Sequence, residues 1–227
     1  MMSAMDITMA EKFLLLALDE SGKDVAGVGV DVGLAASLVA DLLEAGSLRF
    51  DDETLALGAG TSEVPDSPLL RSAHAAAVST GAPAKLDDLL PVIATELSPL
   101  WEQVARQLVE RGVLTEKKER VALVFQVTLH PVSEPAPGQA LRQRLQAVLA
   151  SRTAPSPADS ALLAIAHPFG LLDRLVPAEG QADAARLATA AADSTAFTRA
   201  LEAAVAAARQ TLLAALAASV AGGAAAG

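Results

Sequence analysis

The sequence predicts one mostly α domain with small β-hairpins, and three features indicate this fold. The chain has 227 residues, which is long enough for one large domain with a substantial core. Hydrophobic residues make up 52% of it but aromatic residues only 3%, so we expect helices that pack closely through small side chains. Several segments begin at serine-proline and end near glycine, the usual asymmetry of helix ends. With no fixed-period repeat and no long linker, a single domain is expected over 6–220, followed by a disordered tail over 221–227.

The first half of the chain has the pattern of short helices joined by turns. A helix is expected over 6–19, with Asp6 or Thr8 as its start. A second helix follows the glycine-rich segment 25–33, because leucines recur every four residues from Leu34 and Gly46 then ends it. The next expected elements, in order, are a hairpin with arms 47–50 and 54–57, a helix over 67–81, and a shorter helical segment over 85–97 that Pro91 breaks.

The segment 98–132 combines a helix with the most apolar hairpin of the chain. Ser98 and Pro99 suit the cap and first turn of the helix, apolar residues then recur every four positions from Leu100, and Gly112 ends it. The expected hairpin has residues 113–114 and 121–125 as its two arms, with the charged stretch 116–120 as its turn. His130-Pro131 ends the second arm, since proline cannot donate to a strand ladder.

The second half predicts further helices. Leu141, Leu145, Val148 and Leu149 indicate an amphipathic helix, and Ser156-Pro157 begins the next one. A short helix is expected over 169–176, and two alanine-rich helices over 181–192 and 195–220. Arg209 and Gln210 interrupt the apolar C-terminal stretch, so the sequence favours a buried or docked helix over a transmembrane one.

Composition and motifs exclude several classes of function. The net charge of −10 argues against nucleic-acid binding and against nonspecific adhesion to anionic lipid. The chain has no cysteine, hence no disulfide or thiolate site, and no targeting signal is visible, which fits a cytoplasmic protein. Its three histidines (His74, His130, His167) lack metal-ligand spacing, and no serine has an activating base nearby in sequence. The sequence therefore predicts no enzyme, no metal site and no cofactor.

Two features of the segment 98–132 suggest binding. Trp101, the only tryptophan, is expected as a core or groove anchor, with a membrane- or ligand-facing ring as the alternative. An apolar hairpin with basic neighbours can enter a membrane interface while its cations face headgroups. The alternative is a strand pair packed on the helices or on another subunit. The residues of this hairpin are Lys117, Lys118, Arg120, Val121, Leu123, Val124 and Phe125.

Four blocks, in order, resemble the Golgi phosphoprotein 3 family. They are ITMAEKFLLLALDESGK at 7–23, GLAASLVADLLEAGSLRF at 33–50, LVERGVL at 108–114 with the charged stretch and His-Pro-Val that follow, and ALLAIAHPFGLLDRLVP at 161–177. The chain resembles a prokaryotic member. The resemblance implies a non-enzymatic peripheral membrane adaptor that binds phosphatidylinositol 4-phosphate, places the hairpin against the membrane and holds the cytosolic tails of membrane enzymes.

The family's headgroup pocket, a tryptophan and three arginines, is not retained here. Its positions fall on Ala26, Ala35, Ser98 and Trp101, where none of the four ligands remains. One acid-free stretch offers an alternative basic site with Arg142, Arg144 and Arg152. We therefore expect a lipid-binding adaptor at the cytoplasmic face of a membrane, with anionic or phosphoinositide lipids and protein tails as partners. The alternative is a soluble cytoplasmic scaffold that forms homo-oligomers through the hairpin.

Overall fold

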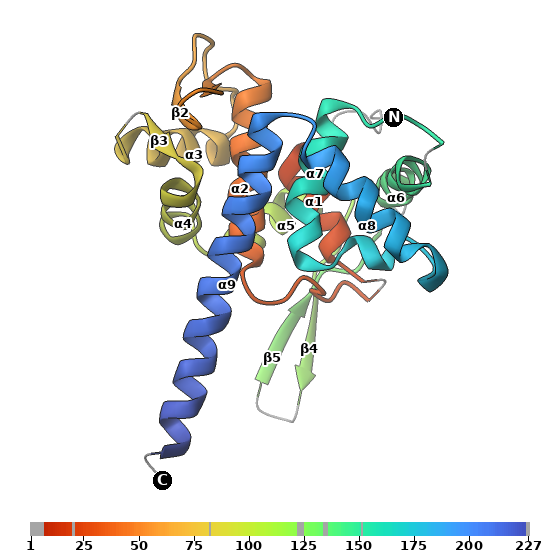
Figure 1. The fold of residues 1–227 in the computed structure, drawn as a ribbon. Helices are drawn as coiled ribbons and strands as arrows, with labels where there is room; N and C mark the ends of the chain where they lie inside the picture. Colours follow the sequence, from red (N-terminus) through yellow and green to blue (C-terminus); the bar gives the residue numbers. More distant parts are fainter. Residues whose placement is uncertain are drawn as a thin grey trace.

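The computed structural model describes residues 7–19, 21–81, 83–121, 125–133, 136–150 and 152–225 (Figure 1). It confirms the predicted fold class, a mostly α single domain with small β-elements. The described helices are α1 (Met9–Ala17), α2 (Val30–Glu44), α3 (Pro68–Ser79), α4 (Leu86–Glu96), α5 (Leu100–Glu110), α6 (Ala136–Leu149), α7 (Pro157–Ala166), α8 (Gln181–Ala192) and α9 (Ala196–Ala225). Segment 167–180, predicted to contain one short helix, instead forms three 3-10 turns, at His167–Phe169, Leu172–Arg174 and Ala178–Gly180.

Helix α2 is the centre of the core. It contacts α1, α3, α4, α5, α7 and α9, and residues 32–40 are all buried. Gly33 allows a close approach on this helix, because a Cβ there would lie 2.3 Å from Cζ of Phe13. The Phe13 ring meets Phe169 edge-on, with centroids 5.3 Å apart. The small residue in α2 thus positions the aromatic pair that joins α1 to the segment after α7.

Two helix starts follow the local signals in the sequence. Thr8 caps α1 in a capping box with Glu11, and Ser156 caps α7 in a box with Asp159. Asp6, the other expected start of α1, lies outside the described residues. The N-terminus of α1 also receives a distant carboxylate: the amides of Met9 and Ala10 donate to Asp41 of α2 at 2.7 and 3.3 Å.

Helix α4 corrects one expectation, because it continues through Pro91 without a break. Proline removes one backbone donor from the helix, but Pro91 itself is exposed. The opposite face of α4 buries Leu89, Leu90 and Ile93, and the helix packs on α2. Burial of that face outweighs the loss of one hydrogen bond.

The first hairpin is part of a three-stranded antiparallel sheet. Strands β1 (Leu48–Asp51) and β2 (Ala56–Ala59) pair as predicted, with the second arm shifted by two residues, and β3 (Ala84–Lys85) adds to β2. The second hairpin, β4 (Lys117–Val121) with β5 (Phe125–Leu129), projects from the helical body (Figure 1).

The arms predicted for the second hairpin were wrong. The charged residues form its first strand, Lys117 pairs with Leu129, and Val121 pairs with Phe125. The connection falls at 122–124, outside the described residues. A strand of charged residues is tolerated because the hairpin stands away from the core, as exposed Lys117 and Thr128 illustrate. The bridge between Leu114 and Val132 continues the pairing toward the body, and the amides of Thr115 and Ser133 donate across the same two segments.

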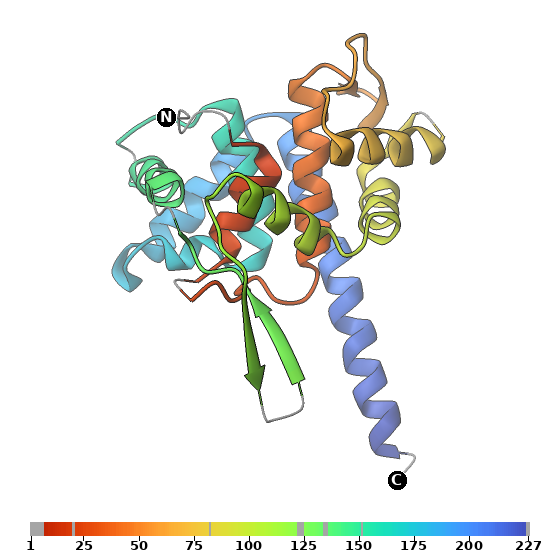
Figure 2. The ribbon, with the colours of Figure 1, turned by 180° about the vertical axis from the view of Figure 1, so that it is seen from behind.

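Helix α9 has a packed half and a projecting half. Its first half buries Leu201, Ala204 and Val205, whereas every residue from Gln210 to Ala221 is exposed. The prediction of a buried or docked helix is therefore wrong for the second half, which extends beyond the body on the same side as the β4–β5 hairpin (Figures 1 and 2). The helix continues to Ala225, where the sequence predicted a disordered tail; residues 226 and 227 lie outside the described residues.

Candidate functional site

The N-terminus of α5 is capped by a carboxylate from another helix. Asp31, in the first turn of α2, accepts hydrogen bonds from the amides of Leu100 at 3.3 Å and Trp101 at 3.0 Å. The hydroxyl of Ser98 donates to the same carboxylate at 3.5 Å. The prediction that Ser98 caps this helix is wrong, because Pro99 holds the cap position and lacks a side-chain donor or acceptor. The amides that would attract an external anion are therefore already paired with a negative group.

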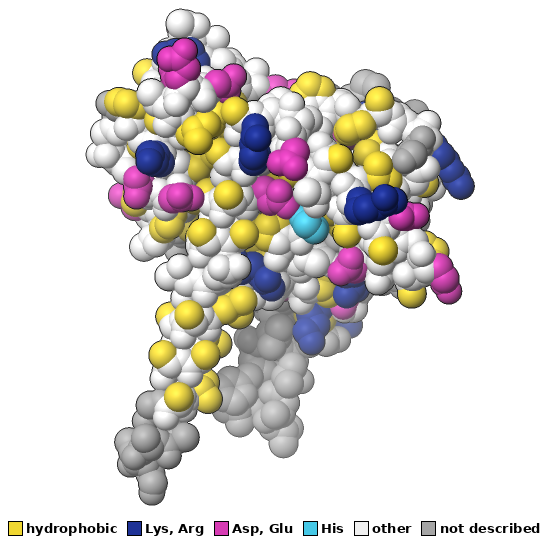
Figure 3. Space-filling view, viewed as in Figure 1, with side chains coloured by type: hydrophobic (Ala, Val, Ile, Leu, Met, Phe, Trp, Pro, Cys, Tyr) yellow, Lys and Arg dark blue, Asp and Glu magenta, His cyan; other side chains and the backbone are white. Residues whose placement is uncertain are grey.

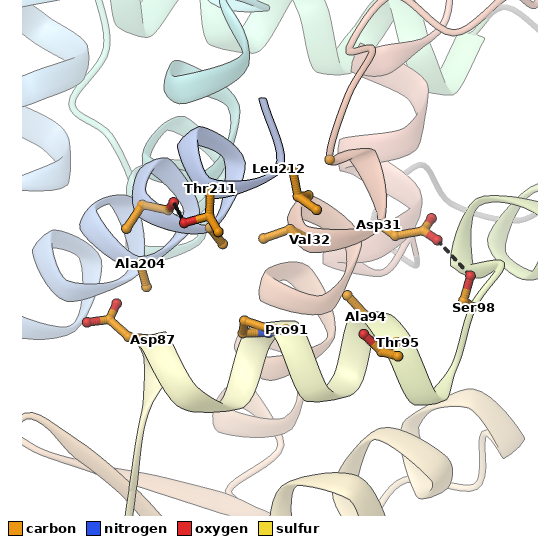
Figure 4. Close-up of a pocket in the computed structure, with 13 residues that line it drawn as sticks. Asp31, Val32, Asp87, Pro91, Ala94, Thr95, Ser98, Ala204, Thr211 and Leu212 are labelled. Carbon is orange, nitrogen blue, oxygen red and sulfur yellow. Dashed lines mark hydrogen bonds between the residues drawn. The ribbon is translucent and has the colours of Figure 1, made fainter. Parts of the chain in front are cut away.

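A cavity of about 540 Å³ lies beside this cap, between α2, α4 and α9 (Figure 4). Asp31 and Ser98 lie at one side of it, and Asp87 lies at the far end of α4. Most of its wall is apolar, with Val32, Pro91 and Leu212 among the contributors. No lysine or arginine lines it among the described residues. Two carboxylates without a cation make this cavity unfavourable for a phosphate group.

Removing the Asp31 cap should destabilise the fold. We expect Asp31→Ala to lower the free energy of unfolding by about 1–2 kcal/mol, because the amides of Leu100 and Trp101 lose their acceptor. Urea denaturation of both proteins measures the change. Asp52→Ala, at an exposed turn, is the matched control and should change stability by less than about 0.5 kcal/mol. Equal midpoints for Asp31→Ala and wild type would show that the cap does not support α5.

The base of the β4–β5 hairpin is fixed to the body by backbone hydrogen bonds. The amide of His130 donates to the carbonyl of Gly22 at 3.1 Å, and the amide of Thr115 donates to Pro131 at 2.9 Å. A Cβ on Gly22 would lie 2.2 Å from the His130 carbonyl carbon, so the turn at Gly22 closes directly against the hairpin. These contacts give the projecting strands a defined direction.

A second cavity, of about 380 Å³, lies at this base. Trp101, Arg106 and His130 contribute to its wall, with Glu102 and Glu116. Burial lowers the pKa of His130, against the opposing charges of Glu116 and Glu102. The Nδ1 atom of this buried histidine has no hydrogen-bond partner among the described residues. At neutral pH the wall of this cavity thus carries a neutral imidazole, one guanidinium group and two carboxylates.

The predicted basic site does not assemble. The guanidinium of Arg142 donates to the carbonyls of Leu15 at 2.9 Å and Leu18 at 3.3 Å, at the C-terminal end of α1. Arg144 forms a two-point ion pair with Asp159 at 2.8 and 2.5 Å, and Arg152 is exposed beyond the end of α6. Burial alone would raise the pKa of Asp159, but the hydrogen bonds from Arg144 and Ser156 keep it below its ordinary value. Arg142 and Arg144 thus bind other parts of the chain.

Five of the seven predicted hairpin residues lie in the two strands. Lys117, Lys118, Arg120 and Val121 lie in β4, and Phe125 begins β5. Leu123 and Val124 lie outside the described residues. Of the three histidines, His167 pairs with Glu202 at 2.5 Å, and the described part of the chain contains no group of three or more residues suited to hold a metal ion.

A comparison with protein families matches Golgi phosphoprotein 3 (GPP34) over residues 9–220. The chain belongs to the Golgi phosphoprotein 3 family. A search of curated proteins finds no match.

The four positions that correspond to the family's headgroup ligands lie in different surroundings. Ala26 and Ala35 are both buried and apolar, at 3% and 0% exposed. Ser98 lines the α2–α4–α9 cavity, whereas half-buried Trp101 lines the cavity at the hairpin base. Ser98 and Trp101 therefore line different cavities, although both donate to the carboxylate of Asp31, Ser98 through its hydroxyl and Trp101 through its backbone amide. Sequence reasoning missed Asp31, since no local pattern relates it to a helix about 70 residues away.

Proposed function

We propose that this Golgi phosphoprotein 3 family member is a non-enzymatic peripheral membrane adaptor that contacts lipid through the β4–β5 hairpin. The supporting observation is that the hairpin projects from the body, on a base held by Gly22 and His130 (Figure 2). Its first strand has three basic residues and one acidic residue in a protein of net charge −10. The sequence VALVF at its tip is apolar. This combination suits an interface of headgroups and acyl chains.

The proposed lipid preference is for anionic surfaces in general. A phosphoinositide pocket at the family position is disfavoured, because Asp31 already pairs with the amides that begin α5. The adjoining cavity presents carboxylates, and the family-equivalent positions Ala26 and Ala35 are apolar and buried. Binding then depends on the basic strand and the apolar tip of the hairpin. In the same proposal the protein acts at the cytoplasmic face of a membrane and holds protein tails there.

The net charge supports a second candidate function. A protein of charge −10 is repelled by an anionic bilayer, so a soluble scaffold that buries the apolar tip of the hairpin in another subunit is the alternative. In the adaptor, lipid covers segment 121–125, whereas in the scaffold another subunit covers it.

Vesicle co-sedimentation distinguishes them. We expect the wild type to sediment with anionic vesicles, and the double variant Leu123→Asp, Phe125→Asp to lose at least about tenfold in binding, because two charges enter an apolar interface. The control is Ser72→Asp with Ala75→Asp, which adds the same charge to exposed positions of α3. Failure of the wild type to bind any vesicle, together with loss of oligomers in the hairpin variant, would replace the adaptor by the scaffold.

A further inference from the structure

The exposed half of α9 presents large apolar side chains to solvent. Leu212, Leu213, Leu216 and Val220 are 40%, 39%, 55% and 70% exposed. By length and composition, Ala196–Ala221 is the one described helix long and apolar enough to cross a membrane, with a mean hydropathy of 1.5. Only 11% of that apolar window is buried inside the protein, so this segment is not a core helix. A signal sequence lies near the N-terminus, whereas this helix lies at the C-terminal side of the domain.

No charged residue occurs from Gln210 to Ala225. The last charge, Arg209, marks where the helix leaves the body. Its guanidinium donates to the carbonyls of Pro168 at 2.8 Å and Val28 at 3.3 Å, and it stacks 5.1 Å from the centroid of the Phe169 ring. The projecting half therefore continues a helix whose first half is fixed to the body, and it begins at a defined residue.

The composition of this half indicates what covers it. At about 100° per residue, Leu212, Leu213, Leu216 and Val220 share one face. The other positions beyond Leu213 are alanine, glycine and one serine. A helix that pairs with a second protein normally carries charged residues on the face that it turns to water. Pairing with one other helix would leave that uncharged back in solvent. In Figure 3 the described part of the projecting helix shows hydrophobic side chains and no charged ones on the face in view. A lipid environment would cover the whole circumference of such a helix.

The direction of α9 places it beside the proposed membrane contact. Its free end and the β4–β5 hairpin extend from the same side of the body in two views half a turn apart (Figures 1 and 2). The segment from 210 to 225 spans about 24 Å at 1.5 Å per residue, less than the roughly 30 Å of a bilayer core. It is long enough to enter the acyl layer and too short to cross it alone.

We infer that the projecting half of α9 inserts into the acyl layer of the bilayer surface that the hairpin contacts. The inference rests on the proposed membrane function and adds a second, uncharged contact to it. The two contacts respond differently to salt, because ions screen the basic strand β4 but have no charge to screen on α9. Binding through α9 should therefore persist at about 0.5 M salt, where the Debye length is only a few ångströms.

The absence of cysteine permits a direct test on the full chain. Val220→Cys, labelled with an environment-sensitive dye, should show a blue-shifted emission on addition of anionic vesicles, and lipids with quenchers in their acyl chains should quench it. Ser72→Cys on α3, labelled in the same way, is the control and should remain in water. An unshifted, unquenched dye at position 220 while the protein is bound to vesicles would overturn the inference.

Charge substitutions separate this inference from the proposed function. Leu216→Asp with Val220→Asp should reduce vesicle binding at least tenfold, with the largest loss at high salt. If the hairpin variant loses binding and the α9 variant binds as wild type does, the hairpin function stands and the α9 contact is wrong. If the wild type binds no vesicle, both fail. Loss of oligomers in the α9 variant, with unchanged lipid binding, would assign this helix to a second copy of the chain instead.

Discussion

Replacement of Arg111 by methionine is expected to lower the free energy of unfolding by about 3–5 kcal/mol, the usual cost of leaving a buried charge without its partner. Nη1 of Arg111 lies 2.6 Å from Oε2 of Glu11, whose side chain is 2% exposed. Glu11 cannot turn to solvent without losing a second role, because its carboxylate accepts the amide of Thr8 at 2.9 Å in the capping box of α1. The pair thus joins the C-terminal end of α5 to the start of α1.

Urea denaturation of a double-mutant cycle tests this account. Arg111→Met alone should be the least stable protein, and Glu11→Gln in the same chain should recover part of the loss, because an amide oxygen retains the cap without a charge. Arg106→Met, on an exposed position of the same helix, is the control, with an expected change below about 0.5 kcal/mol. A stability of Arg111→Met equal to that of the wild type would show that Glu11 does not depend on this guanidinium.

The second large effect is a loss of stability with rising pH that originates at Asp41. Burial raises the pKa of Asp41 to about 7, although the amides of Met9 and Ala10 favour its ionised form. The ordinary value, 3.8, applies to the unfolded chain. Because the folded pKa is the higher one, the stabilisation is complete below pH 3.8 and is lost as pH rises through about 7. From pH 5 to pH 8 the loss amounts to about 3 kcal/mol.

Thermal or urea unfolding between pH 5 and pH 8 measures this loss. In Asp41→Asn the group no longer titrates, so the dependence of stability on pH should be flatter than in the wild type by the same amount. The amide also retains one acceptor for the N-terminus of α1. Parallel pH profiles for the two proteins would show that Asp41 is ionised throughout this range.

The features that the sequence predicts correctly are local. Thr8 and Ser156, predicted as helix starts, cap α1 and α7, and Gly112, predicted to end α5, has a φ of +74°. Each of these signals depends on neighbours along the chain.

The features that it misses depend on tertiary contacts. Asp31 and Asp41 both lie on α2 and cap helices 69 and 32 residues away, so no window along the chain contains either pair. The same holds for Arg142, whose acceptors on α1 lie more than 120 residues away. Composition alone also did not show which half of α9 packs on the body and which half projects from it.

The lipid requirement of the wild type tests the central claim most directly. Binding is measured to two sets of vesicles with equal total negative charge, one containing phosphatidylinositol 4-phosphate and one containing only a singly charged anionic lipid. A peripheral membrane protein that lacks the family's headgroup site should bind both sets equally. A preference of tenfold or more for the phosphoinositide vesicles would contradict the account, because a phosphate site would then exist despite the carboxylate of Asp31 at the start of α5.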